Sequence, residues 1–242
     1  AAVVAQWIDT LLADELTPRR VLGEVARVIE RLPHPNLAAP LARMVARDLT
    51  QWRQQRNAWV EARANGAHNP ATEASHSWTM QYGRALAAIG NEEAISTLRS
   101  YLRDTGFCGF GIDAARAMRE IWIRQEGITE EGLFRGPPEF SGVRVQRIRR
   151  QSSGEYPTSA IAEDIFKAVD CLLQRKDDKE ALAHSLRLAA IGFSIPHGDK
   201  RSQIEQLIKL DQPYSAKLEM FVSLVKAGEL IGWRPIAEAI DS

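Results

Sequence analysis

The residue types that most often carry metal or nucleophilic chemistry are dispersed along this 242-residue chain. The histidines, at positions 34, 68, 76, 184 and 197, form no His-Glu-x-x-His pattern and no close pair with a cysteine, which a zinc site would need. His68 and His76 flank a loop, yet no carboxylates can be placed to complete a metal site beside them. The sequence therefore predicts no metal site and no cofactor.

The glycine-rich stretch GFCGFG, residues 106–111, is the nearest approach to a nucleotide-binding loop. It lacks the Gly-x-Gly-x-x-Gly order and a preceding strand, so we expect its glycines to form a turn between two helices. Cys108 would lie near a helix start, where a thiolate is favoured, but no base accompanies it. We therefore assign no catalytic residue and predict that the chain is not an enzyme. Two carboxylate pairs stand at predicted helix boundaries, where they cap helices or complement helix dipoles: Glu92/Glu93 and Asp177/Asp178.

A first candidate binding surface lies in the predicted helix 40–64, which carries an excess of arginine. Trp52 and Trp59 are seven residues apart and hence lie on one face of this helix. One interpretation makes Trp52, Arg53 and Arg56 an aromatic and basic surface for a partner. In the other, which we favour, both tryptophans cover the core and the arginine stems pack while their charges stay in water. The charged residues of this segment include Arg43, Arg47, Arg53, Arg56 and Arg63 against Asp48 and Glu61.

The second candidate surface is the segment 133–157, whose three prolines, three glycines and three serines predict a loop. Five arginines against Glu139 and Glu155 give it a local charge of +3. Arginines of this kind bind carboxylates or phosphates, and we expect an acidic stretch of a protein partner. The alternative is a solvated loop that a few apolar residues pin to the helices. The predicted contact residues are Arg135, Arg144, Arg147, Arg149 and Arg150.

The chain as a whole is electrically neutral, with 31 Lys and Arg against 31 Asp and Glu, which disfavours a dedicated nucleic-acid binder. Cys108 and Cys171 are far apart and suggest no disulfide framework, as expected in a reducing cytosol. No apolar run approaches the length that crosses a bilayer, and no basic, signal-like start is present. We therefore predict a cytoplasmic chain without membrane contact. The missing initiator methionine is compatible with a piece of a longer chain.

Nearly every apolar pattern has the 3.6-residue period of a helix, and residues 143–148 alone suggest a short strand or an extended loop. Five amphipathic segments are predicted to end at an aspartate, and a second helix follows each. Two of the steps between these aspartates are 34 and 33 residues, which predicts a solenoid of helix pairs. The longer middle steps contain insertions near 49–70 and 125–157 within one domain, 1–242. The aspartates are Asp14, Asp48, Asp104, Asp178 and Asp211, and the second helices are 17–32, 71–89, 109–124, 179–192 and 213–230.

Local signals refine the expected helix ends. Thr17 before Pro18 and Asn91 after Gly90 are predicted N-caps, and Ser202 with Glu205 fits a capping box. The phrase LAAIG occurs twice, at 86–90 and 188–192. In both copies, we expect the small residues to let helices approach closely and the glycine to end the helix.

The helix pairs resemble the HEAT-repeat family. The resemblance rests on NEEAISTLRSYLRD followed by GIDAARAMREIW, and on SQIEQLIKLD followed by PYSAKLEMFVSLVKAGELI. It implies an all-α fold, a right-handed α-solenoid of about five helix pairs whose concave face binds partners. A looser similarity, carried by PPEFSGV and LAAIGFSIPHGDKR, links the chain to the helical-repeat region of large bacterial NACHT-like NTPases. No phosphate-binding loop is present in this sequence.

Two functions compete for such an architecture. The first is a non-enzymatic scaffold that binds a protein partner or another domain of its parent chain. The alternative is a HEAT-like nucleic-acid-binding protein or DNA glycosylase, which would place Trp, Arg and Asp on a basic concave face. No catalytic aspartate between two basic helices can be aligned here, so we expect the scaffold.

Overall fold

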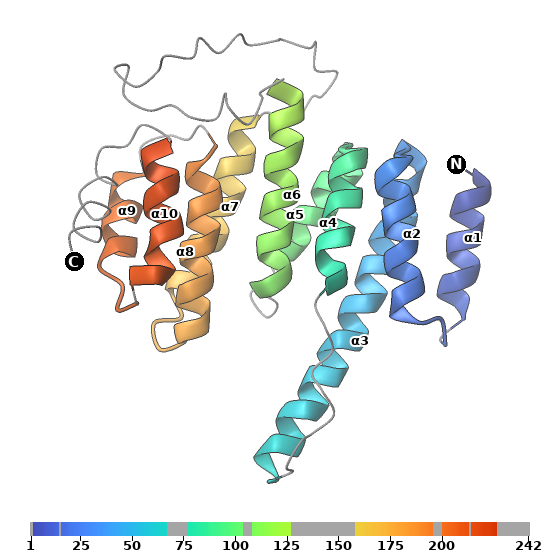
Figure 1. Cartoon of the computed structure of the whole chain (residues 1–242), viewed down its shortest axis with the longest axis horizontal. Coiled ribbons are helices and arrows are strands. Elements are labelled where there is room, and N and C mark those ends of the chain that lie inside the picture. Colours follow the sequence, from blue (N-terminus) through green and yellow to red (C-terminus); the bar gives the residue numbers. More distant parts are fainter. Residues whose placement is uncertain are drawn as a thin grey trace. The chain divides into compact units, whose positions relative to one another are not determined.

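The computed structural model describes residues 2–14, 16–66, 77–103, 108–126, 158–195, 200–212 and 214–226. Within these ranges the regular structure consists of ten α-helices and one short 3-10 helix, without a strand (Figure 1). The predicted all-α class is thereby confirmed. The possible strand at 143–148 lies outside the described residues.

The helices follow the predicted order along the chain. All five predicted second helices are present, as α2, α4, α6, α8 and α10. The elements are α1 Ala2–Ala13, α2 Arg19–Arg31, η1 Pro35–Leu37, α3 Ala38–Ala64, α4 Ser77–Ile89, α5 Glu92–Arg103, α6 Cys108–Glu126, α7 Thr158–Leu173, α8 Lys179–Phe193, α9 Arg201–Ile208 and α10 Tyr214–Lys226.

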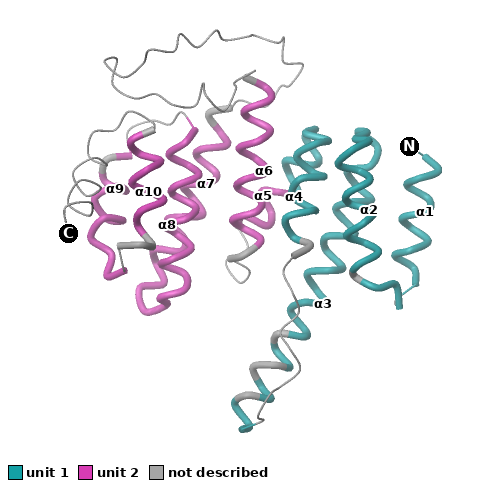
Figure 2. Tube along the Cα trace, viewed as in Figure 1, with its two compact units in different colours: residues 1–97 teal, residues 98–242 magenta. Residues whose placement is uncertain are grey.

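The chain divides into two compact units, Ala1–Thr97 and Leu98–Ser242 (Figure 2). In unit 1, α2 packs along α4, and α1 packs along α3 and η1. The face that α2 buries comprises Leu22, Val25, Ala26 and Ile29, spaced three and four residues apart as an amphipathic helix requires. Helices two places apart in the chain are thus neighbours in this unit.

In unit 2, α8 lies at the centre and packs against α6, α7 and α10 (Figure 1). Its sequence explains this position, because nine of its fifteen residues are buried and several of them are small. Alanine, serine and glycine on several sides of a helix let three neighbours approach it at once. The serine, Ser185, satisfies its buried hydroxyl by donating to the carbonyl oxygen of Leu182 at 2.7 Å.

The two LAAIG copies use their glycines in different ways. Gly90 has φ of 63° and directly follows α4, so it ends that helix as predicted. Gly192 lies inside α8, where a Cβ would stand 3.0 Å from Cζ of Phe166 and 3.2 Å from Cγ2 of Ile165. The prediction that the second glycine ends its helix is therefore wrong. It is the close approach of α8 to α7 that requires a glycine there.

Several predicted helix ends fall on described residues. Asp14 directly follows α1 as predicted, and Asp178 and Asp211 lie beyond the ends of α7 and α9. Asn91 caps α5 as expected, accepting the Ala94 N–H at 3.0 Å. Three other predictions are wrong. Thr17 donates to Asp14 rather than capping α2, and Ser202 lies inside α9, which has no side-chain cap. Asp48 lies within α3 and is fully buried, because the apolar stripe continues beyond it without a glycine or proline to stop the helix.

The Gly192–Phe166 contact yields a first prediction. Gly192→Ala adds a methyl group that the Phe166 and Ile165 side chains must shift to accommodate, and overpacking of this kind costs about 1–3 kcal/mol. Urea denaturation should show this loss of unfolding free energy. The matched control is Gly111→Ala in α6, where the nearest atom to the new Cβ is the Tyr101 carbonyl oxygen at 3.8 Å. That variant should gain about 0.5–1 kcal/mol, since alanine favours helix more than glycine does. Equal effects of the two substitutions would contradict the close approach.

Candidate functional site

The arginines of the second candidate surface cannot be placed. Their positions, together with Asp104, lie outside the described residues. The same holds for the loop that His68 and His76 flank, and nothing is described of the side chains of Arg56, Trp59 and Cys108. The binding role of this surface stays a prediction. The residues concerned are Arg135, Arg144, Arg147, Arg149 and Arg150.

The structure buries one residue of the first candidate surface and exposes another. Trp52 is only 2% exposed and belongs to the core of unit 1, which confirms the packing interpretation for this residue. Arg53, the next residue on α3, is exposed. A partner would therefore meet Arg53 rather than the Trp52 indole. Whether a partner binds there stays a prediction.

Two other arginines of α3 are attached to α1 rather than merely solvated. Arg43 forms an ion pair with Asp9. Arg47 donates to the carbonyl oxygens of Leu11 at 3.0 Å, Leu12 at 3.3 Å and Asp14 at 2.9 Å. Leu11 and Leu12 lie in the last turn of α1, where carbonyls have no partner within the helix, and Asp14 directly follows it. The guanidinium therefore acts as a cap supplied by another helix. The expectation that these arginine charges simply face water is wrong for Arg47, because those carbonyls need donors.

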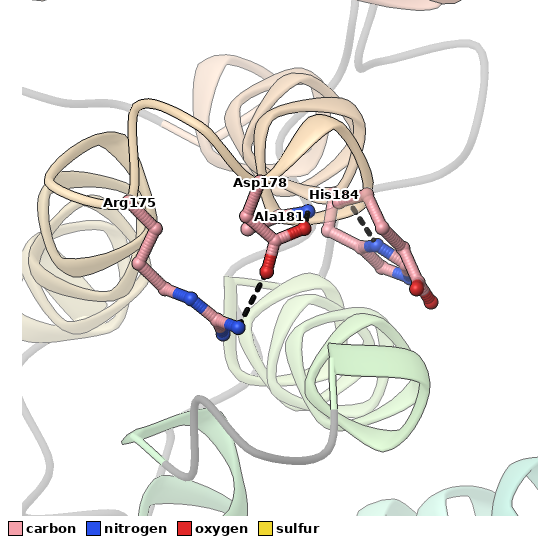
Figure 3. A network of polar contacts seen from close by, with 5 residues as sticks. Arg175, Asp178, Ala181 and His184 are labelled. Atoms are coloured by element: carbon pink, nitrogen blue, oxygen red, sulfur yellow. Dashed lines mark hydrogen bonds and ion pairs between the residues drawn. The ribbon is translucent and has the colours of Figure 1, made fainter. Parts of the chain in front are cut away.

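The turn between α7 and α8 forms an open depression of ≈ 790 Å³, lined by residues 174–179. Asp178 is one of the lining residues, and Figure 3 shows its polar contacts. One carboxylate oxygen accepts the Ala181 N–H at 3.0 Å, and the other pairs with Arg175. The ring Nδ1 of His184 lies 2.7 Å from the Glu180 carbonyl oxygen. A carbonyl only accepts, so Nδ1 carries the hydrogen.

The electrostatics of this turn favour an ionised Asp178. The hydrogen bond from the Ala181 backbone N–H lowers the pKa of this carboxyl below its ordinary value of 3.8. Burial acts in the opposite direction, whereas the charges of Arg175 and His184 and the Glu180 N–H lower the pKa further. One carboxylate oxygen caps the start of α8, and the other pairs with Arg175. We therefore assign Asp178 to helix capping, the role expected of the Asp177/Asp178 pair.

Charged contacts also join the first helices of successive pairs in unit 2. Arg99 of α5 pairs with Asp164 of α7, whose side chain is 6% exposed. Lys200, at the start of α9, pairs with Glu163 at 2.9 Å and lies 5.2 Å from the centre of the Phe166 ring. Sequence analysis missed these contacts, because their partners are 37 to 65 residues apart and no local pattern links them.

The described residues offer little for metal chemistry or membrane insertion. No group of three or more His, Cys, Asp or Glu side chains in the described ranges is placed to hold a metal ion. Among the described helices, none combines the length and apolar character needed to cross a bilayer.

Comparison with known proteins returned no similarity: no family model, curated protein or solved structure matches the chain at a significant level.

The Asp178 cap generates a second prediction, with a defined pH dependence. Asp178→Ala should lower the unfolding free energy by about 1 kcal/mol at neutral pH, as the loss of an N-cap does. Because folding lowers the pKa of Asp178, its contribution is present above pH 3.8 and is lost as pH falls through the lower folded-state value. Denaturation curves of the variant and the wild type should therefore converge in acid. Asp177→Ala, in the same turn and exposed, is the control and should change little. A difference that persists undiminished well below pH 3.8 would contradict the assignment.

Proposed function

We propose that the chain is a non-enzymatic, cytoplasmic helical-repeat scaffold, an α-solenoid of HEAT-like pairs that binds a protein partner or another domain of its parent chain. The observation that carries the proposal is the packing of helices two places apart. It joins α1 to α3 and α2 to α4 in unit 1, and α8 to α6 and α10 in unit 2.

This packing is what stacked helix pairs produce. A single pair cannot bury its apolar stripes alone, so successive pairs stack, first helix on first helix and second on second. The ion pairs between α5 and α7 and between the start of α9 and α7 follow the same rule for first helices. The right-handed sense and the HEAT assignment rest on the sequence resemblance.

Exposed apolar side chains support a binding surface on the second helices. Val28 of α2 and Leu32 at its end are one turn apart and are 51% and 71% exposed. Leu218 and Val222 have the same spacing on α10 and are 41% and 37% exposed. Val3 and Trp7 of α1 are exposed as well, so such groups are not confined to the second helices. Pairs of exposed apolar side chains indicate protein contacts more than catalysis. In a solenoid of this family, the second helices line the concave face.

The third prediction tests partner binding. The variant with Arg144, Arg147, Arg149 and Arg150 changed to Ala should lose most of its affinity for a partner, because charge-assisted pairs with acidic side chains disappear. Proteins enriched by the tagged wild-type chain would be identified, purified and measured against both forms by calorimetry. We expect at least about a tenfold weaker dissociation constant for the variant, since such hydrogen bonds contribute about 1.5–3 kcal/mol each.

The matched control removes the same charge elsewhere. It changes four exposed basic residues that lie outside the second helices, and its partner affinity should stay near that of the wild type. Unchanged affinity in the first variant would refute the role of the 133–157 segment. Absence of any partner that binds as a purified protein would refute the scaffold. The control residues are Lys167, Arg175, Lys176 and Lys209.

The alternative function, binding of DNA or RNA, predicts a different result for the molecules that the tagged chain enriches. If the chain bound DNA or RNA, the enriched material would be sensitive to nuclease, and retention on heparin would fall steeply with salt. We expect neither, because the chain has no net charge.

A further inference from the structure

Helix α1 buries little of its own surface. Ile8 is the one residue of this twelve-residue helix that is fully buried, whereas α8 buries nine of fifteen. Val3 and Trp7, one turn apart on α1, are 78% and 49% exposed. Burial of apolar side chains is the main force that docks a helix, so α1 is weakly held by this means.

Polar contacts from α3 supply the rest of the attachment. Arg43 and Arg47 are one turn apart on α3, so they project from the same side of that helix. Arg43 pairs with Asp9 in the body of α1, and both side chains are about half exposed. Arg47 donates to the three carbonyl oxygens of Leu11, Leu12 and Asp14 at the end of the helix. We call Arg43 and Arg47 together the arginine brace.

The corner after α1 has hydrogen bonds of its own, besides the bond from Arg47 to the Asp14 carbonyl oxygen. The Asp14 carboxylate accepts the Leu16 N–H at 3.0 Å and the Thr17 hydroxyl at 3.3 Å. The Asp14 carbonyl also accepts the Thr17 N–H at 3.1 Å. These bonds are local to residues 14–17 and do not involve α3. The turn after α1 can therefore persist while α1 detaches from η1 and α3.

We propose that α1 is a detachable strap, which opens from the η1 and α3 surface of unit 1 while α2 and α4 stay folded. The arginine brace sets how often it opens. Elements with few buried contacts open locally, at a lower free energy than the whole domain. Release uncovers apolar surface of unit 1, so opening would control which surface the unit presents. The inference goes beyond partner binding and does not depend on it.

Hydrogen exchange of the full chain, followed by mass spectrometry, tests the strap. In the wild type, amides of α1 should exchange much faster than those of α2 and α4. Arg47→Met keeps an apolar stem but loses the donors, and should speed α1 exchange by about tenfold or more, as loss of charged hydrogen bonds predicts. Arg43→Met should have a smaller effect, because exposed ion pairs contribute less. Added salt should speed α1 exchange in the wild type.

The control is Arg84→Met, which removes an exposed arginine from α4 and should leave α1 exchange unchanged. Exchange in α2 and α4 reports whether each variant remains folded. The strap is refuted if α1 exchanges as slowly as α2 in the wild type. It is also refuted if Arg47→Met speeds α1, α2 and α4 equally, since that result means that unit 1 opens as a whole.

Discussion

The contact of Phe166 with Gly192 is the constraint on which unit 2 depends. Phe166 is buried in α7, and the missing side chain of Gly192 lets α8 approach its ring. The ring of Phe193 lies 5.0 Å from that of Phe166, and the Lys200 ammonium lies 5.2 Å from it. The Phe166 side chain thus sets the spacing of α7 and α8, and it also contacts Lys200 at the start of α9. Since α8 also packs on α6 and α10, a change in the spacing of α7 and α8 would disturb the packing of most of unit 2.

Several polar side chains of the described residues serve the ends of helices. Asn91 and Asp178 satisfy N–H groups at the starts of α5 and α8. Arg47 satisfies carbonyls at the end of α1, and Lys217 donates to the Ile208 carbonyl oxygen at the end of α9 at 2.8 Å. Every helix leaves several backbone groups without partners, and a chain of many short helices has many such ends. This demand explains the structural roles of Asp178 and Arg47.

Periodic features were predictable from the sequence, and contacts across the fold were not. The apolar period located all five second helices and the full length of α3, because burial of a helix face imposes that spacing on the chain. The capping role of Asp178 follows from its position before a helix. By contrast, the two LAAIG copies have the same letters and different roles, since the role of Gly192 depends on Phe166, which is 26 residues away. Arg47 differs from a solvated arginine only through α1, which no local pattern reveals.

The central claim is that helices stack on those two places away in the chain. Methyl nuclear Overhauser spectra of the full chain measure this directly, because cross-peaks join methyl groups that lie close in space. The account predicts cross-peaks that connect leucine, isoleucine and valine methyls of α2 with those of α4, and of α8 with those of α6 and α10. Cross-peaks confined to helices that are consecutive in the sequence would contradict it.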